Sequence, residues 1–320
     1  MRKFFVVILI QMAFATLALA QEREVSIAAE WGSISATLAV PDEGATTAAL
    51  IVAGSGPTDR NGNSSLQLNT YAYKMLSDEL VEGGFAVLRY DKRGLPLSAA
   101  PTELMLDVVF SDYVDDAALC VDYLRDMGYD RVVVVGHSEG GQIALELALR
   151  SELGVDGVVL LSAAGYPMET ILMRQLSAQL MPSYVGLMIS ATDIIQRLKR
   201  GETIAEESIP KELLSLFHPA VQPFVRSNLT TDPQELISRV EQPVLIISGG
   251  RDIQVSVDNA ERLVERAKRA QHISFENMCH TLKDTVTSDR IEQLMSVYIN
   301  SQLPLSEGLA AAIVEFLKTI

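Results

Sequence analysis

The chain alternates between short, continuous apolar runs and longer segments in which apolar residues recur every three or four positions. Short apolar runs are typical of strands buried on both faces, and the longer spacing is typical of amphipathic helices. The expected strands are residues 24–29, 33–40, 48–53, 85–90, 132–135, 157–161, 243–248 and 271–275, and the expected helices are 71–81, 112–127, 257–270 and 305–320. This alternation predicts an α/β fold with a mostly parallel sheet that helices cover on both faces.

Residues 166–239 interrupt the alternation, because they show no good strand pattern. Periodic apolar residues predict helices there, and several prolines cut these helices into short pieces. We therefore expect a core domain formed by residues 21–165 and 240–320, with residues 166–239 as a helical cap. The cap is inserted between two core strands, which favours a position over a site at the strand ends. Its apolar side chains, among them Met173 and Leu176, are expected to contact the substrate.

The first twenty residues have the pattern of a secretory signal peptide. Two basic residues precede an almost unbroken apolar run, and Ala18-Leu19-Ala20 matches the small-x-small pattern of a cleavage site. We expect cleavage after Ala20 and a periplasmic or secreted protein that begins at Gln21. The alternative is an uncleaved anchor. The apolar run is short for a full span and a charged segment follows at once, so we expect no stable membrane insertion after signal removal.

Charge and cysteine content narrow the expected partners. The 320 residues carry a formal net charge of −15. No basic groove is recognisable, so nucleic acid is not an expected partner, and anionic membranes would repel the protein. Cys120 lies on the apolar stripe of a predicted helix and Cys279 lies in a loop. An exported protein could pair them, but their settings favour two buried free thiols. No Cys/His cluster has metal-ligand spacing, and neither metal nor cofactor is expected.

The most informative segment is RVVVVGHSEGG, residues 131–141. Four valines predict a buried strand, G-x-S-x-G follows directly, and a helical pattern begins after it, which is the context that a nucleophile elbow requires. Gly136 and Gly140 lack a Cβ, so the turn can be sharp and other backbone can approach closely. Ser138 is therefore the predicted nucleophile, at the N-terminus of a helix whose dipole stabilises a developing negative charge.

A serine hydroxyl needs a base to take its proton, usually a histidine that a carboxylate orients. With an elbow of this kind the three residues follow in the order Ser, Asp or Glu, His. Of four histidines, only His280 follows the last predicted strand, where the base is needed. His137 adjoins the nucleophile, and its side chain is expected to point away from Ser138. The loop after the preceding strand supplies Asp252 as the acid, with Asp258 as the second choice.

An oxyanion hole needs two backbone N–H donors, one after the nucleophile and one in a loop after an earlier strand. The first donor is predicted at Glu139. The second is predicted at Ser55, in the loop AGSGPTDRNGN of residues 53–63, where Gly54 and Gly56 let the Ser55 amide turn inward. A phosphate cradle is the alternative interpretation, but the loop lacks a Walker lysine and does not continue as G-x-G-x-x-G.

Together these residues resemble the α/β-hydrolase superfamily. The shared signatures are VVGHSEGG around Ser138, RYDKRG at residues 89–94, and the Gly-Arg-Asp and Cys-His loops that carry Asp252 and His280. The loop GSGPTDRNGN further resembles that of exported bacterial esterases, which are grouped near the serine aminopeptidase-like hydrolases. The resemblance covers nearly all of the chain after residue 20. It implies the α/β-hydrolase fold and a serine hydrolase without a cofactor, but it does not carry over a substrate.

The expected activity is hydrolysis of small-molecule carboxylic esters through an acyl-enzyme intermediate, with Ser138, His280 and Asp252 as the catalytic triad. A serine aminopeptidase and a thioesterase are alternatives. An aminopeptidase would need a carboxylate in the cap to hold the substrate ammonium group, and the available candidates are Glu169, Glu202, Glu206, Glu207 and Glu235. A binding protein on a hydrolase scaffold is the alternative outside the enzymes, and the complete triad argues against it.

Overall fold

The computed structural model describes residues 21–65, 68–179 and 185–320. The predicted signal peptide lies outside these residues. Within them, strand β1 begins at Gln21 and pairs with β2 over its whole length, from Gln21 opposite Val40 to Ala29 opposite Gly32. The predicted hairpin is therefore present, and its first strand includes Gln21 to Arg23, which precede the strand that the apolar pattern predicted.

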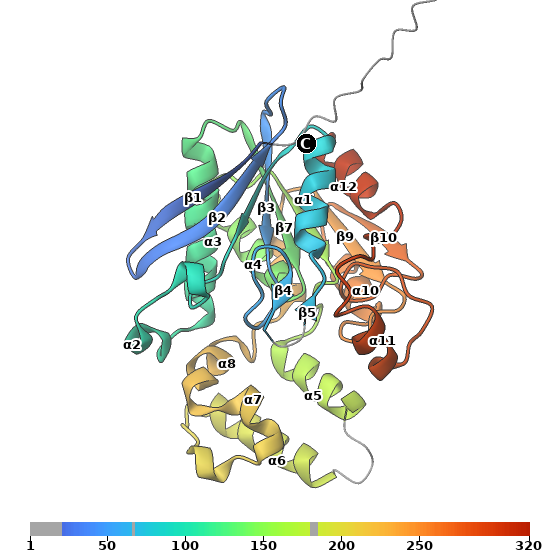
Figure 1. Ribbon diagram of the computed structural model, residues 1–320. Helices are drawn as coiled ribbons and strands as arrows, with labels where there is room; N and C mark the ends of the chain where they lie inside the picture. Colours follow the sequence, from blue (N-terminus) through green and yellow to red (C-terminus); the bar gives the residue numbers. More distant parts are fainter. Residues whose placement is uncertain (1–20, 66–67, 180–184) are drawn as a thin grey trace, which may run out of the picture.

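The centre of the protein is an eight-stranded sheet in the order β1-β2-β6-β3-β7-β8-β9-β10. Its strands are β1 (Gln21–Ala29), β2 (Gly32–Val40), β3 (Thr47–Val52), β6 (Ala86–Tyr90), β7 (Arg131–His137), β8 (Gly157–Leu161), β9 (Val244–Gly249) and β10 (Ala270–Phe275). β2 pairs antiparallel with β1 and β6, and the strands from β6 to β10 run parallel, as Figure 1 shows. The predicted mostly parallel sheet is confirmed.

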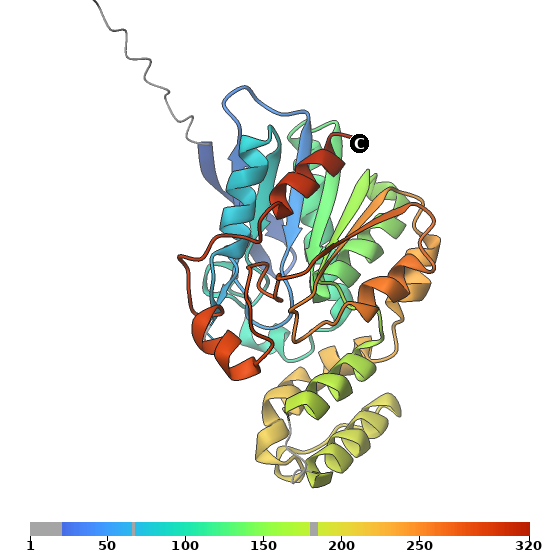
Figure 2. The ribbon, with the colours of Figure 1, turned by 90° about the vertical axis from the view of Figure 1, so that its right-hand side faces the viewer.

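Helices cover both faces of this sheet, as Figures 1 and 2 show. One face carries α1 (Ala72–Glu82) and α12 (Leu309–Leu317), and the other carries α3 (Phe110–Asp126), α4 (Glu139–Leu149) and α10 (Asp258–Val264).

The valines of β7 explain this two-sided arrangement. Val132 and Val134 join the cluster on the α3 and α4 side, whereas Val133 and Val135 join the cluster on the α1 and α12 side. Successive side chains of a strand point to opposite faces, so a strand made only of valine needs a cover on both. All four side chains are 0% exposed, and full burial of each contributes at most about 1.5–3 kcal/mol.

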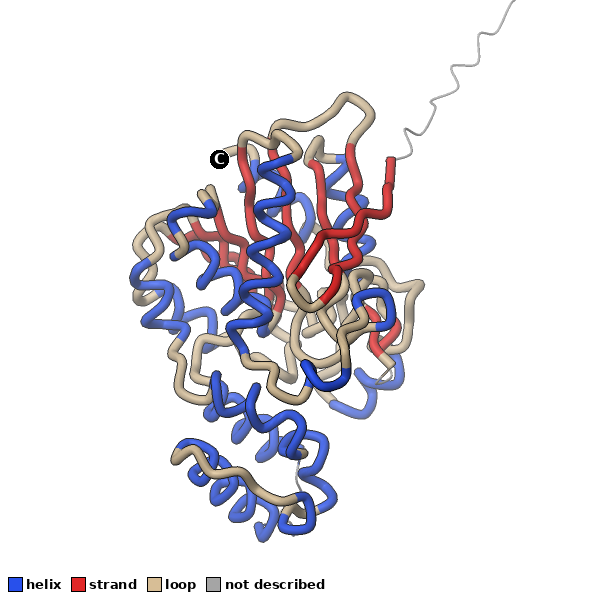
Figure 3. The backbone as a smooth tube through the Cα atoms, turned by 90° about the vertical axis from the view of Figure 1, so that its left-hand side faces the viewer, coloured by secondary structure: helices blue, strands red, loops and turns tan. Residues whose placement is uncertain are grey.

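Among the described residues of 166–239, the regular elements are all helices and no strand occurs. They form α5 (Met168–Gln179), α6 (Val185–Lys199), α7 (Leu214–Phe217), α8 (Gln222–Asn228) and α9 (Pro233–Arg239). Helices α5 to α8 lie below the sheet in Figure 1, beyond the carboxyl ends of the parallel strands, and Figure 3 shows a block of helices below the sheet from the side. They have a separate apolar core that includes Leu176, Ile195 and Phe217. Helix α9 instead packs on α4 and α10 of the core.

Several short elements gave no clear pattern in the sequence. They are β4 (Asn63–Ser64), β5 (Leu68–Asn69), α2 (Thr102–Met105) and α11 (Arg290–Ser296). The last helix begins later than predicted, at Leu309, because Gly308 has a left-handed φ of 84° that helical residues do not adopt. The helix predicted over 257–270 ends at Val264. Strands and helices this short bury few side chains, so their periodicity is too weak to detect.

Both cysteines are buried and free. Cys120 lies in the cluster with α3 and α4, whereas Cys279 packs with Val297 and Tyr298 in a separate one. Among the described residues, no helix is both long and apolar enough to cross a membrane. The same residues contain no group of three or more side chains that could hold a metal ion.

Candidate active site

Ser138 occupies a strained turn between β7 and α4. Its backbone has φ 54° and ψ −118°, a conformation that L-residues rarely adopt and that costs about 1–3 kcal/mol. Surrounding backbone holds the turn closely. A Cβ on Gly140 would lie 2.3 Å from the Val52 carbonyl oxygen, and one on Gly136 would lie 2.2 Å from the Gly140 carbonyl oxygen. The two glycines are therefore sterically required, and the turn places Ser138 at the N-terminus of α4, as the sequence predicts.

His280 and Asp252 form a buried pair beside this turn. His280 Nδ1 donates to Asp252 Oδ2 at 2.8 Å, and Asp252 Oδ1 accepts from the backbone N–H groups of Gln254 and Val255, both at 2.8 Å. Burial alone would raise the pKa of Asp252, but the charge and hydrogen bond of His280 and these two amides lower it overall. Asp252 is therefore an anion near neutral pH, and it fixes which His280 nitrogen carries the proton.

The second choice for the acid is not at this site. The Asp258 carboxylate accepts from Arg174 at 2.7 Å on the surface, where both side chains are exposed. In the described structure, no other histidine has a buried carboxylate partner like the Asp252 partner of His280. His218 is exposed in the insert beside Glu206, and His272 Nε2 shares a hydrogen bond with the Ser248 hydroxyl at 2.9 Å.

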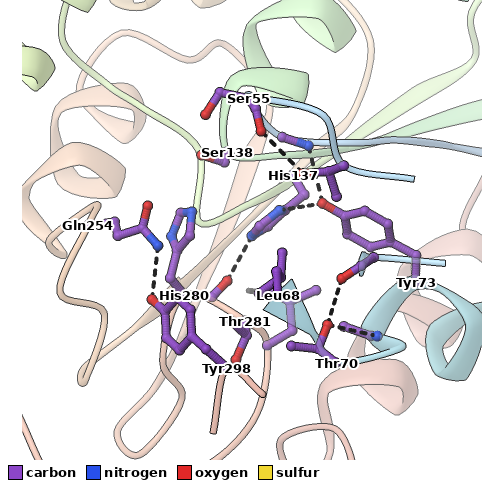
Figure 4. A pocket seen from close by; sticks show the side chains of 15 residues that line it. Ser55, Leu68, Thr70, Tyr73, His137, Ser138, Gln254, His280, Thr281 and Tyr298 are labelled. Atoms are coloured by element: carbon purple, nitrogen blue, oxygen red, sulfur yellow. Dashed lines mark hydrogen bonds between the residues drawn. The ribbon is translucent and has the colours of Figure 1, made fainter. Parts of the chain in front are cut away.

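Ser138 and His280 line one pocket of about 100 Å³. The other walls come mainly from the segment after β3, including Ser55, Leu68 and Tyr73, and Figure 4 shows Ser55 next to Ser138. Leu282 and Tyr298 also line it. No described residue of 166–239 lines this pocket, so its shape depends on the core loops.

The loop after β3 approaches the nucleophile closely. A Cβ built on Gly54 would lie 3.1 Å from the Ser138 Cβ, which only a glycine avoids without a shift. Ser55, next in the chain, lines the pocket. In the described part of the chain, neither the Ser55 N–H nor the Glu139 N–H donates to a protein acceptor. Both amides are thus available to a ligand oxygen beside Ser138, as the oxyanion prediction requires.

Residues of the signature RYDKRG form hydrogen bonds to the loop after β3. Asp91 accepts from the Arg60 backbone N–H at 2.8 Å and from its guanidinium at 3.0 Å. Arg89 donates to the Asn61 side-chain oxygen. Asp91, Arg60 and Arg89 are all buried. The loop of residues 53–63 and the segment RYDKRG of residues 89–94 are therefore one structural unit at the ends of β3 and β6.

His137 differs from its expectation. Its side chain does not leave the site but lines the pocket with Ser138, as Figure 4 shows. Tyr73 OH lies 2.8 Å from His137 Nδ1 and accepts from the Gly54 N–H at 3.2 Å, and His137 Nε2 lies 2.8 Å from the His280 carbonyl oxygen. These distances describe one chain of hydrogen bonds, in which Tyr73 donates to Nδ1 and Nε2–H donates to the carbonyl.

This chain of hydrogen bonds requires a neutral imidazole, because Nδ1 must accept. Burial lowers the pKa of His137 to about 3, with a further contribution from the neighbouring His280. His137 therefore connects the loop of Gly54 to the loop of His280 through uncharged contacts. No sequence pattern pointed to Tyr73, and the only signal for His137 was its place beside the nucleophile.

The carboxylates considered for an ammonium group are not at the pocket. Glu169 pairs with Lys199 at 2.7 Å, Glu202 pairs with Arg197 at 2.8 Å, and Glu206 lies 3.4 Å from His218. Glu207 and Glu235 are also absent from the pocket walls, which contain no Asp or Glu among the described residues. The walls are formed by apolar, hydroxyl, amide and imidazole groups.

Comparison with known proteins agrees with this architecture. Esterase EstD of Thermotoga maritima is 28% identical over 239 residues, which are 73% of this chain and 54% of that protein. Epoxide hydrolase 3 of Xenopus tropicalis is 26% identical over 169 residues, 49% of this chain and 44% of that protein. The chain thus spans about half the length of the curated relatives it matches.

The solved structure of an esterase from Pyrococcus furiosus superposes with a TM-score of 0.60 at 16% identity, over 94% of this chain and 91% of that one. At that identity the likeness shows a shared fold, which is the α/β-hydrolase fold. The family model described as serine aminopeptidase, S33 matches residues 69–284, more than half of the chain. The protein therefore belongs to the serine aminopeptidase S33 family of α/β-hydrolases.

Proposed function

We propose that this protein is a serine hydrolase that cleaves small-molecule carboxylic esters. The observation that carries the proposal is the shared pocket of Ser138 and His280, with the buried Asp252 carboxylate 2.8 Å from His280 Nδ1. This arrangement provides a nucleophile, a base and a group that orients the base. The similarity to esterase EstD agrees with it.

In the proposed mechanism, Ser138 Oγ attacks the acyl carbon while His280 Nε2 takes its proton. Asp252 holds the imidazole through Nδ1 and stabilises the imidazolium that forms. The electron pair of the carbonyl bond moves to its oxygen, which accepts from the amides of Ser55 and Glu139 at the positive end of α4. Collapse returns that pair, and the alcohol leaves with the proton from His280. Water then cleaves the acyl-enzyme by the same steps, so no cofactor takes part.

An ester is favoured over an amino-acid amide because of the pocket walls. A substrate with a free ammonium group would need a carboxylate nearby, since burying an unpaired charge is unfavourable. The only carboxylate of the triad, Asp252, has no exposed side-chain surface and is already paired with His280. Aminopeptidase activity, which the family name suggests, therefore has no ammonium partner in the described part of the pocket. A thioester, being uncharged, would meet no such obstacle.

The test is a substrate panel with wild-type protein and the Ser138→Ala variant. We expect hydrolysis of 4-nitrophenyl acyl esters that Ser138→Ala abolishes, and much slower turnover of amino-acid 4-nitroanilides. A thioester series with the same acyl groups tests whether the protein is a thioesterase instead. Labelling by a serine-directed fluorophosphonate should occur in the wild type and disappear in Ser138→Ala. Absence of both labelling and hydrolysis would favour a binding protein on this scaffold.

We also propose that the protein is exported and cleaved after Ala20. The support is the signal pattern of residues 1–20, in which two basic residues and an apolar run precede Ala18-Leu19-Ala20. Expression with the native N-terminus, followed by intact mass measurement of the periplasmic fraction, tests this. A full-length product that needs detergent would favour the anchor.

A further inference from the structure

Lys92, in the signature RYDKRG, has a contact that the triad does not explain. Its side chain is 5% exposed, and its Nζ donates to the Gly54 carbonyl oxygen at 2.5 Å. That carbonyl belongs to the same peptide group as the Ser55 N–H. A cation therefore lies on one end of the peptide whose other end is proposed to hold the oxyanion.

The geometry of a peptide group connects the two ends. A trans peptide is planar, and its C=O and N–H point in opposite directions. The described chain has no cis peptide bond. Since the Gly54 carbonyl points toward buried Lys92, the Ser55 N–H points the other way, and Ser55 lines the pocket with Ser138. The preceding peptide is held as well, because the Gly54 N–H donates to Tyr73 OH at 3.2 Å.

We propose that Lys92 is a positioning residue for the oxyanion hole: it fixes the Gly54–Ser55 peptide and polarises it, so that the Ser55 N–H becomes a stronger donor to the transition state. This inference rests on the proposed ester hydrolysis. Hydrogen bonds in series polarise one another, and the effect is larger when the donor is charged and water is excluded. The positive charge behind the peptide also favours negative charge in front of it.

Packing alone does not account for a lysine here. Burying an ammonium group is unfavourable unless it is paired, and methionine would fill similar space without that penalty. In the described part of the chain, no carboxylate lies within 4.0 Å of Lys92 Nζ. Burial lowers the pKa of Lys92, and the nearby charge of Glu139 raises it in part. The Gly54 carbonyl is therefore the group on which the charge of Lys92 acts.

The test compares an ester with its thionoester in wild type and Lys92→Met. Sulfur is a weak hydrogen-bond acceptor, so a thionoester gains little from the oxyanion donors. Removal of a whole donor lowers turnover by about 10²–10³, and Lys92→Met leaves the donor but weakens it, so we expect kcat for the ester to fall roughly 10- to 100-fold. The KM should change little. The ratio of kcat for the ester to kcat for the thionoester should be markedly lower in Lys92→Met than in the wild type.

The matched control is Arg125→Met. Arg125 is also a cation that donates to backbone carbonyls, those of Tyr129 and Asp130, at the opposite ends of the strands. The Arg125→Met variant should be less stable than the wild type, with no change in the ester-to-thionoester ratio of kcat. Lys92→Gln keeps an N–H donor without the charge, and it supplies the same readout if Lys92→Met does not fold.

Equal losses of ester and thionoester turnover in the Lys92 variants would overturn the inference, because a purely structural role would affect both substrates alike. An unchanged kcat would overturn it too. Failure of the proposed function would appear in the wild-type protein, as ester turnover that does not depend on Ser138. The two failures are therefore distinguishable.

Discussion

Acid should destabilise this protein through His137. The imidazole has a pKa of about 3 in the folded state, whereas an unfolded histidine has a pKa of about 6.5. Between these values the unfolded chain binds a proton that the folded protein excludes, so the free energy of unfolding falls as pH decreases. The stabilisation is complete above pH 6.5 and disappears progressively below it.

The magnitude follows from the two pKa values. Protonation of the unfolded chain lowers the free energy of unfolding by about 1.4 kcal/mol for each pH unit well below 6.5, until the folded-state pKa is reached. Between pH 7.5 and pH 5 the expected loss from this single group is about 2 kcal/mol. That is a large share of the roughly 5–15 kcal/mol by which a domain is usually stable.

Urea unfolding at a series of pH values measures this loss. The informative variant is His137→Gln, whose amide can accept from Tyr73 and donate to the His280 carbonyl but does not titrate. Its stability should depend less on pH than that of the wild type, by about 2 kcal/mol over the same range. His218→Gln, the same change at an exposed histidine of the insert, is the control. Identical pH dependence in wild type and His137→Gln would refute the reasoning.

Three further outcomes are expected. Ser138→Gly should abolish hydrolysis yet raise the free energy of unfolding by roughly 1 kcal/mol, because glycine adopts φ 54° without strain; a less stable variant in urea unfolding would contradict this. Tyr73→Phe leaves the Gly54 N–H and His137 Nδ1 without their partner, so it should lower the free energy of unfolding by about 1–3 kcal/mol and also lower kcat. Tyr123→Phe loses no hydrogen bond in the described structure, so it should change neither quantity. Leu176→Ala should destabilise the insert by about 2–5 kcal/mol, since Leu176 is buried in its core; fluorophosphonate labelling of the folded variant should persist, and its loss would show that the insert supports the pocket.

Local features of the site could be predicted because a few consecutive residues decide them. The elbow at Ser138 needs only a buried strand, two glycines at the right spacing and a helix, and all of these are adjacent in the sequence. The pairing of Asp252 with His280 followed from chain order, since residues after successive parallel strands meet at the same edge of a sheet.

The insert shows where such reasoning is incomplete. Its helical nature followed from apolar periodicity and proline spacing, but the expected contact of its side chains with the pocket did not appear among the described residues. The pocket walls come instead from residues such as Leu68 and Tyr298, on short or irregular segments whose patterns carry no periodic signal. How far an inserted domain projects depends on packing between helices that no local pattern encodes.

The sequence by itself determined the strands of the sheet, the covering helices and the sharp turn at Ser138, because periodicity and short motifs record interactions between near neighbours. Only the tertiary structure decided that Lys92 contacts the Gly54 carbonyl and that His137 connects Tyr73 to the His280 loop. These contacts join residues 38, 64 and 143 positions apart. Such pairs depend on how buried polar groups satisfy one another once the core has formed, and that outcome is not written in any local pattern.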